Sequence, residues 1–254
     1  MNYKNFAISL AKEAGAEIRK NFANGLKMSK EWKKDGTPVT KTDIAINKMV
    51  IKGVKKFFPK HGVLGEEESY NITNTEYLWV CDPVDGTVPF SHGIPTCVFS
   101  LALVKNGQPI LGVIFEPFLK RMFFAEKNKG AFLNGKKISV NKLNFPQGVM
   151  GFSNLGMTEL KTRFPQMPII CLWCICYEGI LVASGELTAT YYNHYNAHDI
   201  AALKVIVEEA GGKVTDKNGN EQRYDGKING AIISNGVVHN DLIKIINKHY
   251  KKAE

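Results

Sequence analysis

Two acidic segments directly follow apolar stretches that are typical of buried strands. Residues 82–87 read Asp-Pro-Val-Asp-Gly-Thr and come after the run Leu78–Cys81, while Gly65–Glu68 comes after Val63-Leu64. Because Pro83 cannot pair inside a sheet, we expect the chain to turn there, with Asp82 and Asp85 facing one another across the turn. Two such carboxylates repel unless a cation lies between them. The spacing therefore predicts a cation site.

Two further features extend this cation site towards phosphate chemistry. Gly86 and Thr87 present backbone amides that suit phosphate oxygens if a helix begins there. Asp199 stands at the start of a helix predicted for 199–210, where a lone aspartate is usually a helix cap. Together, the carboxylates, the amides and the Thr87 hydroxyl are the groups that magnesium-assisted phosphate hydrolysis requires.

The elements that must position these groups follow from the hydrophobic periodicity. Helices are predicted for 3–22, for a stretch from about 43 to Pro59, and for 176–183, 199–210 and 239–251. Strands are predicted at 63–64, 77–81, 98–104, 110–115, 121–125, 148–153, 169–171, 189–192, 214–215 and 231–234. This alternation indicates stacked layers of an α+β or α/β protein. The seam lies near 140–146, which divides the chain into 1–140 and 141–254.

Composition excludes several classes of protein. The 254 residues are 44% hydrophobic and 22% charged, which is ordinary for a globular chain and excludes disorder, collagen and coiled coil. The net charge of +9 comes from scattered lysines, so we expect no nucleic-acid partner. No secretory signal or membrane span is expected, and the five cysteines, including Cys171, Cys174 and Cys176, are interpreted as reduced core thiols of a cytoplasmic protein.

Two longer stretches of the sequence have a distinctive order of residues. Residues 79–90 read Trp-Val-Cys-Asp-Pro-Val-Asp-Gly-Thr-Val-Pro-Phe, and 198–212 read His-Asp-Ile-Ala-Ala-Leu-Lys-Val-Ile-Val-Glu-Glu-Ala-Gly-Gly. Both resemble the signatures of the inositol monophosphatase family, which contains magnesium-dependent, lithium-sensitive phosphatases. Shorter motifs at 39–43, 64–67 and 129–135 follow in the family order, so the resemblance covers nearly the whole chain. It implies a layered αβαβα sandwich of the sugar-phosphatase type, with the site between its halves.

The resemblance also implies a set of metal ligands for two to three magnesium ions. Glu66, Asp82 and the Val84 carbonyl would hold the first ion. Asp82, Asp85 and Asp199 would hold the second, with Asp82 bridging the two. The implied reaction is hydrolysis of a small phosphate monoester, in which a metal-activated water attacks phosphorus in line. A homodimer is implied as well.

The remaining roles that the resemblance implies concern the water and the phosphate. Asp43 and Glu66 would orient waters around a third, weaker ion. Thr87, hydrogen-bonded to Asp43, would help to deprotonate the attacking water. The Gly86 and Thr87 amides would hold the phosphate. Glu67 would contact the metal ligands rather than the metal ions.

The substrate loop departs from the family pattern. A glutamate expected shortly before Asp199 is missing, which argues against myo-inositol 1-phosphate, and His198 replaces the usual tryptophan. Asn193, His194 and Tyr195 are candidates to bind another ester, such as histidinol phosphate, a sugar phosphate or a nucleotide 3′-phosphate. They are equally typical of the polar residues of an ordinary surface loop.

Two other functions stay open from the sequence. Fructose 1,6-bisphosphate would require basic residues at the pocket mouth, for which Lys33, Lys34 and Arg163 are candidates, although each is also typical of surface charge. A non-catalytic relative that binds RNA or protein is disfavoured, because every expected metal carboxylate and the Thr87 hydroxyl are present.

Overall fold

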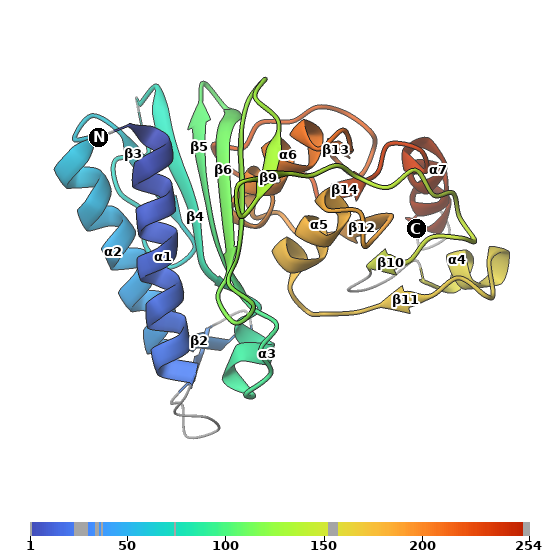
Figure 1. Cartoon of the computed structure of the whole chain (residues 1–254), viewed down its shortest axis with the longest axis horizontal. Helices are drawn as coiled ribbons and strands as arrows, with labels where there is room; N and C mark the ends of the chain where they lie inside the picture. The colour runs from blue at the N-terminus through green and yellow to red at the C-terminus, as the bar shows by residue number, and fades with distance from the viewer. Residues whose placement is uncertain are drawn as a thin grey trace.

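The computed structural model of the chain describes residues 2–22, 30–33, 36, 38–73, 75–151 and 157–250. Within these residues the chain forms five layers, in the order helices, sheet, helices, sheet, helices (Figure 1). The predicted αβαβα sandwich is therefore confirmed. Three clusters of buried apolar side chains fill the spaces between the layers, because each sheet face and helix stripe must bury its apolar side.

The larger sheet carries the acidic segments. Its strands follow the order β3-β4-β5-β6-β7-β8-β9, and every neighbouring pair is antiparallel except β3 and β4, which are parallel. The bounds are β3 Gly62–Gly65, β4 Tyr77–Asp85, β5 Val98–Lys105, β6 Gln108–Glu116, β7 Arg121–Glu126, β8 Ala131–Leu133 and β9 Lys136–Lys137. Asn106 (φ 51°) and Gly107 (φ 84°) make the tight turn between β5 and β6, as this dipeptide favours.

Two long helices cover one face of the larger sheet. They are α1 (Tyr3–Phe22) and α2 (Lys41–Phe57), both visible at the left of Figure 1. Their buried stripes surround the fully buried ring of Trp79 on β4. A two-stranded ribbon, β1 (Lys30–Trp32) with β2 (Pro38–Thr40), leads into α2. This packing fixes the start of α2 beside the end of β4.

The smaller sheet follows the order β11-β10-β12-β14-β13. Its strands are β10 Met150–Gly151, β11 Ile169–Ile170, β12 Ala189–Tyr192, β13 Lys213–Thr215 and β14 Ala231–Ser234. Helices α5 (Ile175–Ala183) and α6 (Ala201–Glu209) lie between the two sheets, and α4 (Met157–Arg163) and α7 (His239–Tyr250) lie at the far end (Figure 1). Since α5 and α6 share a core with the larger sheet, the division into 1–140 and 141–254 stays a prediction.

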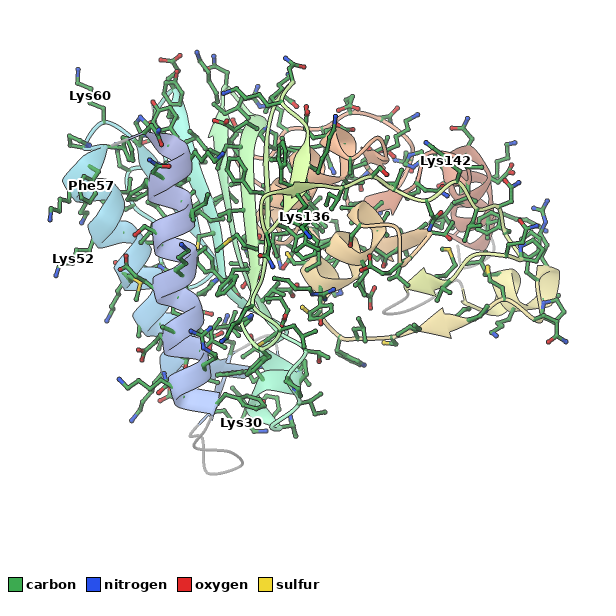
Figure 2. The ribbon with its side chains drawn as sticks, viewed as in Figure 1. Lys30, Lys52, Phe57, Lys60, Lys136 and Lys142 are labelled. Carbon is green, nitrogen blue, oxygen red and sulfur yellow. The ribbon has the colours of Figure 1, made fainter. Side chains whose placement is uncertain are left out.

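Several elements differ from the periodicity. Of the strand predicted for 148–153, only Met150–Gly151 among the described residues 148–151 form β10, and residues 152 and 153 lie outside the described part of the chain. The short elements β1, β2, β8, β9 and α4 were not predicted, since two to seven residues carry too little periodic signal. The lysines are scattered as expected: Lys52, Lys60, Lys136 and Lys142 are exposed and lie at separate places (Figure 2). In the described part of the chain, no helix is long and apolar enough to cross a membrane.

Candidate metal centre and active site

The end of β4 brings Asp82 and Asp85 together by a bulge. The turn predicted at Pro83 is wrong, because β4 continues to Asp85. Asp82 pairs with Ser100 and Asp85 with Val98, so three steps on β4 match two on β5. In a regular strand, residues three apart point to opposite faces, and the extra residue removes that alternation. The proline's missing N–H falls in this irregular stretch, where no regular ladder bond is lost.

Asp199 reaches the same place from the other half of the chain. It is not the helix cap that a lone aspartate at this position usually is: it ends the 3₁₀ turn η2 (Ala197–Asp199), and α6 begins after Ile200 without a side-chain cap. Its Oδ2 instead accepts a hydrogen bond from the Tyr192 hydroxyl. One carboxylate oxygen each of Asp82, Asp85 and Asp199 lies within 4.8 Å of the others, and the three residues are only 2%, 7% and 8% exposed.

The electrostatics of these three carboxylates favour a bound cation. Burial, together with the charge of Asp199, raises the pKa of Asp85 to about 7. Burial and the charges of Glu66 and Asp85 raise the pKa of Asp82 well above its ordinary value. A divalent ion among these oxygens would remove the repulsion, and carboxylate oxygens are the donors that Mg²⁺ prefers. The residues present therefore fit a magnesium site.

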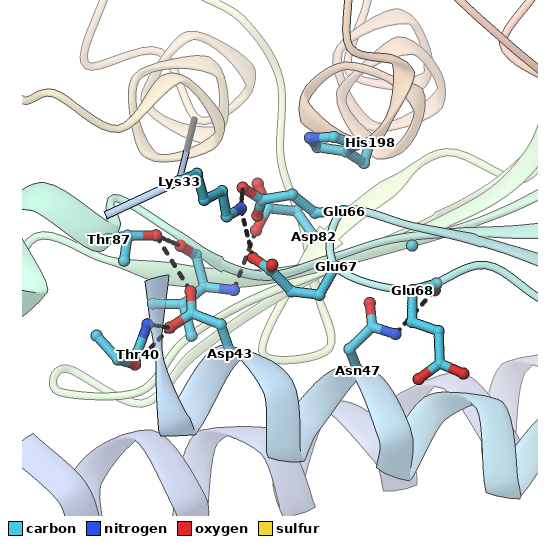
Figure 3. A network of polar contacts seen from close by, with 12 residues as sticks. Lys33, Thr40, Asp43, Asn47, Glu66, Glu67, Glu68, Asp82, Thr87 and His198 are labelled. Atoms are coloured by element: carbon cyan, nitrogen blue, oxygen red, sulfur yellow. Dashed lines mark hydrogen bonds and ion pairs between the residues drawn. The ribbon is translucent and has the colours of Figure 1, made fainter. Parts of the chain in front are cut away.

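Asp43 belongs to the first turn of α2 and faces Thr87. Thr40 is the N-cap of α2, and Asp43 Oδ2 accepts hydrogen bonds from the Thr40 N–H (2.9 Å) and hydroxyl, a reciprocal capping box. The other oxygen, Oδ1, accepts the Thr87 hydroxyl at 3.2 Å, the contact expected from the resemblance (Figure 3). Burial raises the pKa of Asp43 to about 6. The capping box thus fixes a carboxylate that can take up a proton near neutral pH.

Gly86 and Thr87 open the short helix α3 (Thr87–Ser91), so a helix begins where we expected. Gly86 has φ 90°, and a Cβ there would lie 2.5 Å from the Thr96 carbonyl oxygen. Only glycine fits this position. The Thr87 hydroxyl also approaches the Val84 carbonyl oxygen at 2.9 Å. Thr87 therefore lies between the carbonyl of Val84 and the carboxylate of Asp43.

A second carboxylate group joins Asp43 to Glu66 and Glu67. One oxygen of each of the three lies within 4.8 Å of the others. Lys33 Nζ donates to Glu66 Oε1 at 2.8 Å and to Glu67 Oε1 at 2.6 Å (Figure 3). Although burial lowers the pKa of Lys33, these two carboxylates raise it above its ordinary value. The interpretation of Lys33 as surface charge is therefore wrong; Lys34 lies outside the described residues, and Arg163 is exposed on α4.

The cysteines near the site have contacts that sequence reasoning missed. Cys174 is the N-cap of α5, and its thiol donates to Asp85 Oδ2 at 3.1 Å. The Cys176 N–H donates to the same oxygen, and the Cys176 thiol donates to the Asp199 carbonyl oxygen at 3.0 Å. Cys174 and Cys176 are buried but are not simple core thiols, and Cys171 is exposed. The signal in the sequence was the close spacing of Cys171, Cys174 and Cys176.

The predicted substrate loop and His198 lie differently from expectation. His194 and Tyr195 are exposed, and Asn193 Oδ1 accepts the Tyr191 hydroxyl. Among the described contacts, none joins Asn193, His194 or Tyr195 to the carboxylates. His198, considered only as a replacement for tryptophan, has a ring nitrogen within 4.8 Å of carboxylate oxygens of Glu66 and Asp82. Its place directly before a predicted metal ligand was the signal that could have identified it.

Comparisons with known proteins agree with this geometry. The model of the inositol monophosphatase family matches residues 2–251. A fructose-1,6-bisphosphatase/inositol-1-monophosphatase of Thermotoga maritima is 33% identical over 217 residues, covering 83% of this chain and 82% of that protein. A histidinol-phosphatase of Chlorobaculum parvum is 31% identical over 248 residues, covering 94% and 95%.

Solved structures show the same fold. A Thermotoga maritima IMPase superposes with a TM-score of 0.89 at 31% identity over 100% of both chains. An IMPase/NADP phosphatase complexed with Mg²⁺ and phosphate superposes with a TM-score of 0.86 at 25% identity, covering 96% of this chain and 94% of that one. Together with the family model, these similarities show that the chain belongs to the inositol monophosphatase family of phosphatases.

Proposed function

We propose that the protein is a magnesium-dependent phosphomonoesterase that uses two to three ions. The observation that carries this proposal is the convergence of Asp82, Asp85 and Asp199, whose oxygens lie within 4.8 Å of one another in a buried site. Glu66, Asp82 and the Val84 carbonyl would hold one ion, and the three converging aspartates would hold the second. Asp43 and Glu66 would orient waters around a third ion. Two-metal sites of this kind suit in-line phosphoryl transfer to water.

The protein's own residues would position the phosphate and move the proton. Bound Mg²⁺ would supply Lewis-acid chemistry, which neutralises phosphoryl charge and lowers the pKa of coordinated water. Thr87 Oγ1 would accept a proton from the attacking water and pass its own to Asp43, whose pKa of about 6 suits a proton acceptor. The amides of Gly86 and Thr87 would bind phosphate oxygens. Glu67 would hold Lys33 beside Glu66.

Histidinol phosphate is a second candidate for the substrate, beside an inositol phosphate. Two observations favour it: a 31% identical relative is a histidinol-phosphatase, and the chain lacks the glutamate expected before Asp199. A site that lacks this hydrogen-bond partner discriminates less well in favour of polyols. Fructose 1,6-bisphosphate and nucleotide 3′-phosphates are the remaining candidate substrates, the first because a relative is named for it.

Phosphate release from a panel of esters tests this function. The panel contains inositol 1-phosphate, histidinol phosphate, fructose 1,6-bisphosphate and adenosine 3′,5′-bisphosphate, each with Mg²⁺ and with EDTA. We expect Mg²⁺-dependent release from at least one ester and none in EDTA. Release that persists in EDTA, or no release from any ester with Mg²⁺, would refute the proposal.

We also propose that the protein is a homodimer. A cavity of about 340 Å³ lies beside α3 and is lined mainly by apolar side chains, among them Val88, Ile94 and Trp173. Ile94 is 51% and Trp173 is 60% exposed, which is unusual for clustered large apolar residues unless another surface covers them. A second copy of the chain is the partner we propose. Light scattering should give the dimer mass for the wild type and the monomer mass for Ile94→Asp; a monomeric wild type would refute this proposal.

A cytoplasmic location is part of the same proposal. All five cysteines, every one of which lies in the described part of the chain, are free, and reduced thiols are typical of the cytoplasm. Cell fractionation with compartment markers would test it.

A further inference from the structure

His198 approaches the carboxylates from the side opposite to α2. It lies in η2, and Figure 3 shows its ring facing Glu66 and Asp82 while Asp43 rises from the helix below. One ring nitrogen lies within 4.8 Å of the carboxylate oxygens of Glu66 and Asp82. Its side chain is 13% exposed, so the ring lies within the site rather than on the surface.

The ring has no other structural task among the described residues. Its nearest charged atom is Asp199 Oδ2, which lies 3.9 Å from Nε2, too far for a hydrogen bond. No hydrogen bond in the described part of the chain involves its nitrogens. The buried side-chain atoms without a partner in the described part of the chain do not include these nitrogens, so they keep some contact with solvent. They are therefore free to bind a cation together with the two carboxylates.

We propose that His198 supplies a nitrogen ligand to the cation held by Glu66 and Asp82. This inference rests on the proposed metal-dependent function. Mg²⁺ prefers oxygen donors, whereas imidazole suits first-row transition metals such as Mn²⁺ and Co²⁺. The Glu66–Asp82–His198 site therefore favours a transition ion over Mg²⁺.

The two cation positions are then chemically different. The Asp82–Asp85–Asp199 group offers only carboxylate oxygens, which is the donor set of a magnesium site. The Glu66–Asp82–His198 group adds nitrogen and shares Asp82 with it. A mixture of Mg²⁺ and Mn²⁺ should consequently fill the two positions unequally. The family signature carries tryptophan at 198, so a His198→Trp variant gives a direct comparison.

Pulsed electron paramagnetic resonance of bound Mn²⁺ tests the nitrogen ligand without using activity. Metal-depleted wild-type protein receives less than one equivalent of Mn²⁺, and we expect a ¹⁴N modulation from a coordinated imidazole. His198→Gln and His198→Trp should lose this modulation. His92→Asn is the matched control, because the His92 imidazole contacts the Val88 carbonyl rather than the carboxylates, and it should keep the modulation.

Titration calorimetry on the same proteins measures the preference between ions. Loss of a neighbour that only orients a ligand lowers metal affinity about 10- to 100-fold, so loss of the ligand itself should lower the ratio of Mn²⁺ to Mg²⁺ affinity by about tenfold or more. Thermal melting in EDTA confirms that each variant is folded before it is compared.

The outcomes separate this inference from the proposed function. A wild-type protein without ¹⁴N modulation, or a modulation that survives in both folded His198 variants, would overturn the nitrogen ligand while ester hydrolysis still stands. Nitrogen coordination in a protein that hydrolyses no ester would leave the site intact and overturn the function. Variants that change only KM for the ester, with unchanged Mn²⁺ affinity, would make His198 a substrate contact and also overturn the inference.

Discussion

Replacing Asp43 with asparagine should stabilise the metal-free protein at neutral pH. Burial raises the pKa of Asp43 from 3.8 to about 6 in the folded state. Well below pH 3.8 the carboxyl is protonated in both states. As pH rises towards 6, the unfolded chain releases this proton first, so the wild type loses stability. One pH unit corresponds to 1.36 kcal/mol, which makes the full loss about 3 kcal/mol, of which about 2 kcal/mol develops between pH 4.5 and pH 8.

Asparagine keeps the local structure while removing the charge. The asparagine side-chain oxygen can accept hydrogen bonds from the Thr40 N–H and hydroxyl, as Asp43 Oδ2 does. The capping box therefore keeps its hydrogen bonds and loses only the negative charge. The variant should gain about 2 kcal/mol relative to the wild type between pH 4.5 and pH 8. For a chain of this length that equals about 4–8 °C in Tm. Its activity with Mg²⁺ should fall, since Thr87 loses its proton acceptor.

Thermal melting in EDTA at pH 4.5, 6 and 8 measures this difference. Asp241→Asn is the control, because its carboxylate is 54% exposed and pairs with Lys244 alone among the described residues, so its Tm should follow the wild type at every pH. If Asp43→Asn and the wild type differ in Tm by the same amount at pH 4.5 and pH 8, the buried carboxylate does not destabilise the fold. The raised pKa of Asp43, on which this prediction depends, would then be wrong.

Substitutions at three further residues test the contacts of the site. Asp85→Asn should leave the circular dichroism spectrum unchanged and lower Mg²⁺-dependent phosphate release about a hundredfold or more, because even indirect metal contacts are worth 10- to 100-fold; near wild-type release would refute its assignment. Cys174→Val should raise the Mg²⁺ concentration for half-maximal activity about tenfold, whereas Cys174→Ser, which keeps a donor to Asp85, should not; equal effects of the two would show that only packing matters. Lys33→Met should lower the Mg²⁺ dissociation constant about fivefold, equivalent to ~1 kcal/mol, because the ammonium competes with a cation for Glu66, and calorimetry showing weaker binding would contradict this reasoning.

Much of the fold was predictable because its long elements have strong periodic patterns. A local signal is present within the helix at 3–22, the helix that ends before Pro59, and the hairpin with its turn at Asn106-Gly107. The bulge at Pro83 was not predicted, because a proline in a strand reads equally well as a turn or as an irregularity in pairing. The partner strand β5 decides between them, and its register is set by the rest of the sheet.

The acidic members of the site were predictable from motifs, and their neighbours were not. Asp82 and Asp85 occur in one short segment, so their proximity follows from the chain itself. The contacts of Lys33, Cys174 and His198 with the carboxylates span from 33 to more than 100 positions in sequence, and each of these residue types is common on surfaces or in cores. Only the packing of separate elements distinguishes a lysine that pairs with Glu66 from one that is solvated.

The structure suggests why these neighbours are cations, thiols and amides rather than apolar side chains. The centre gathers carboxylates from α2, β4, the segment after β3, and η2, and burial raises the pKa values of Asp43, Asp82 and Asp85. Without ions such a cluster opposes folding, so its neighbours donate hydrogen bonds or a positive charge to the carboxylates. The Cys176 N–H and the Cys174 thiol do this for Asp85, and Lys33 does it for Glu66. His198 is the exception, since its nitrogen donates to none of the described carboxylates, and this difference is what assigns it to the cation itself.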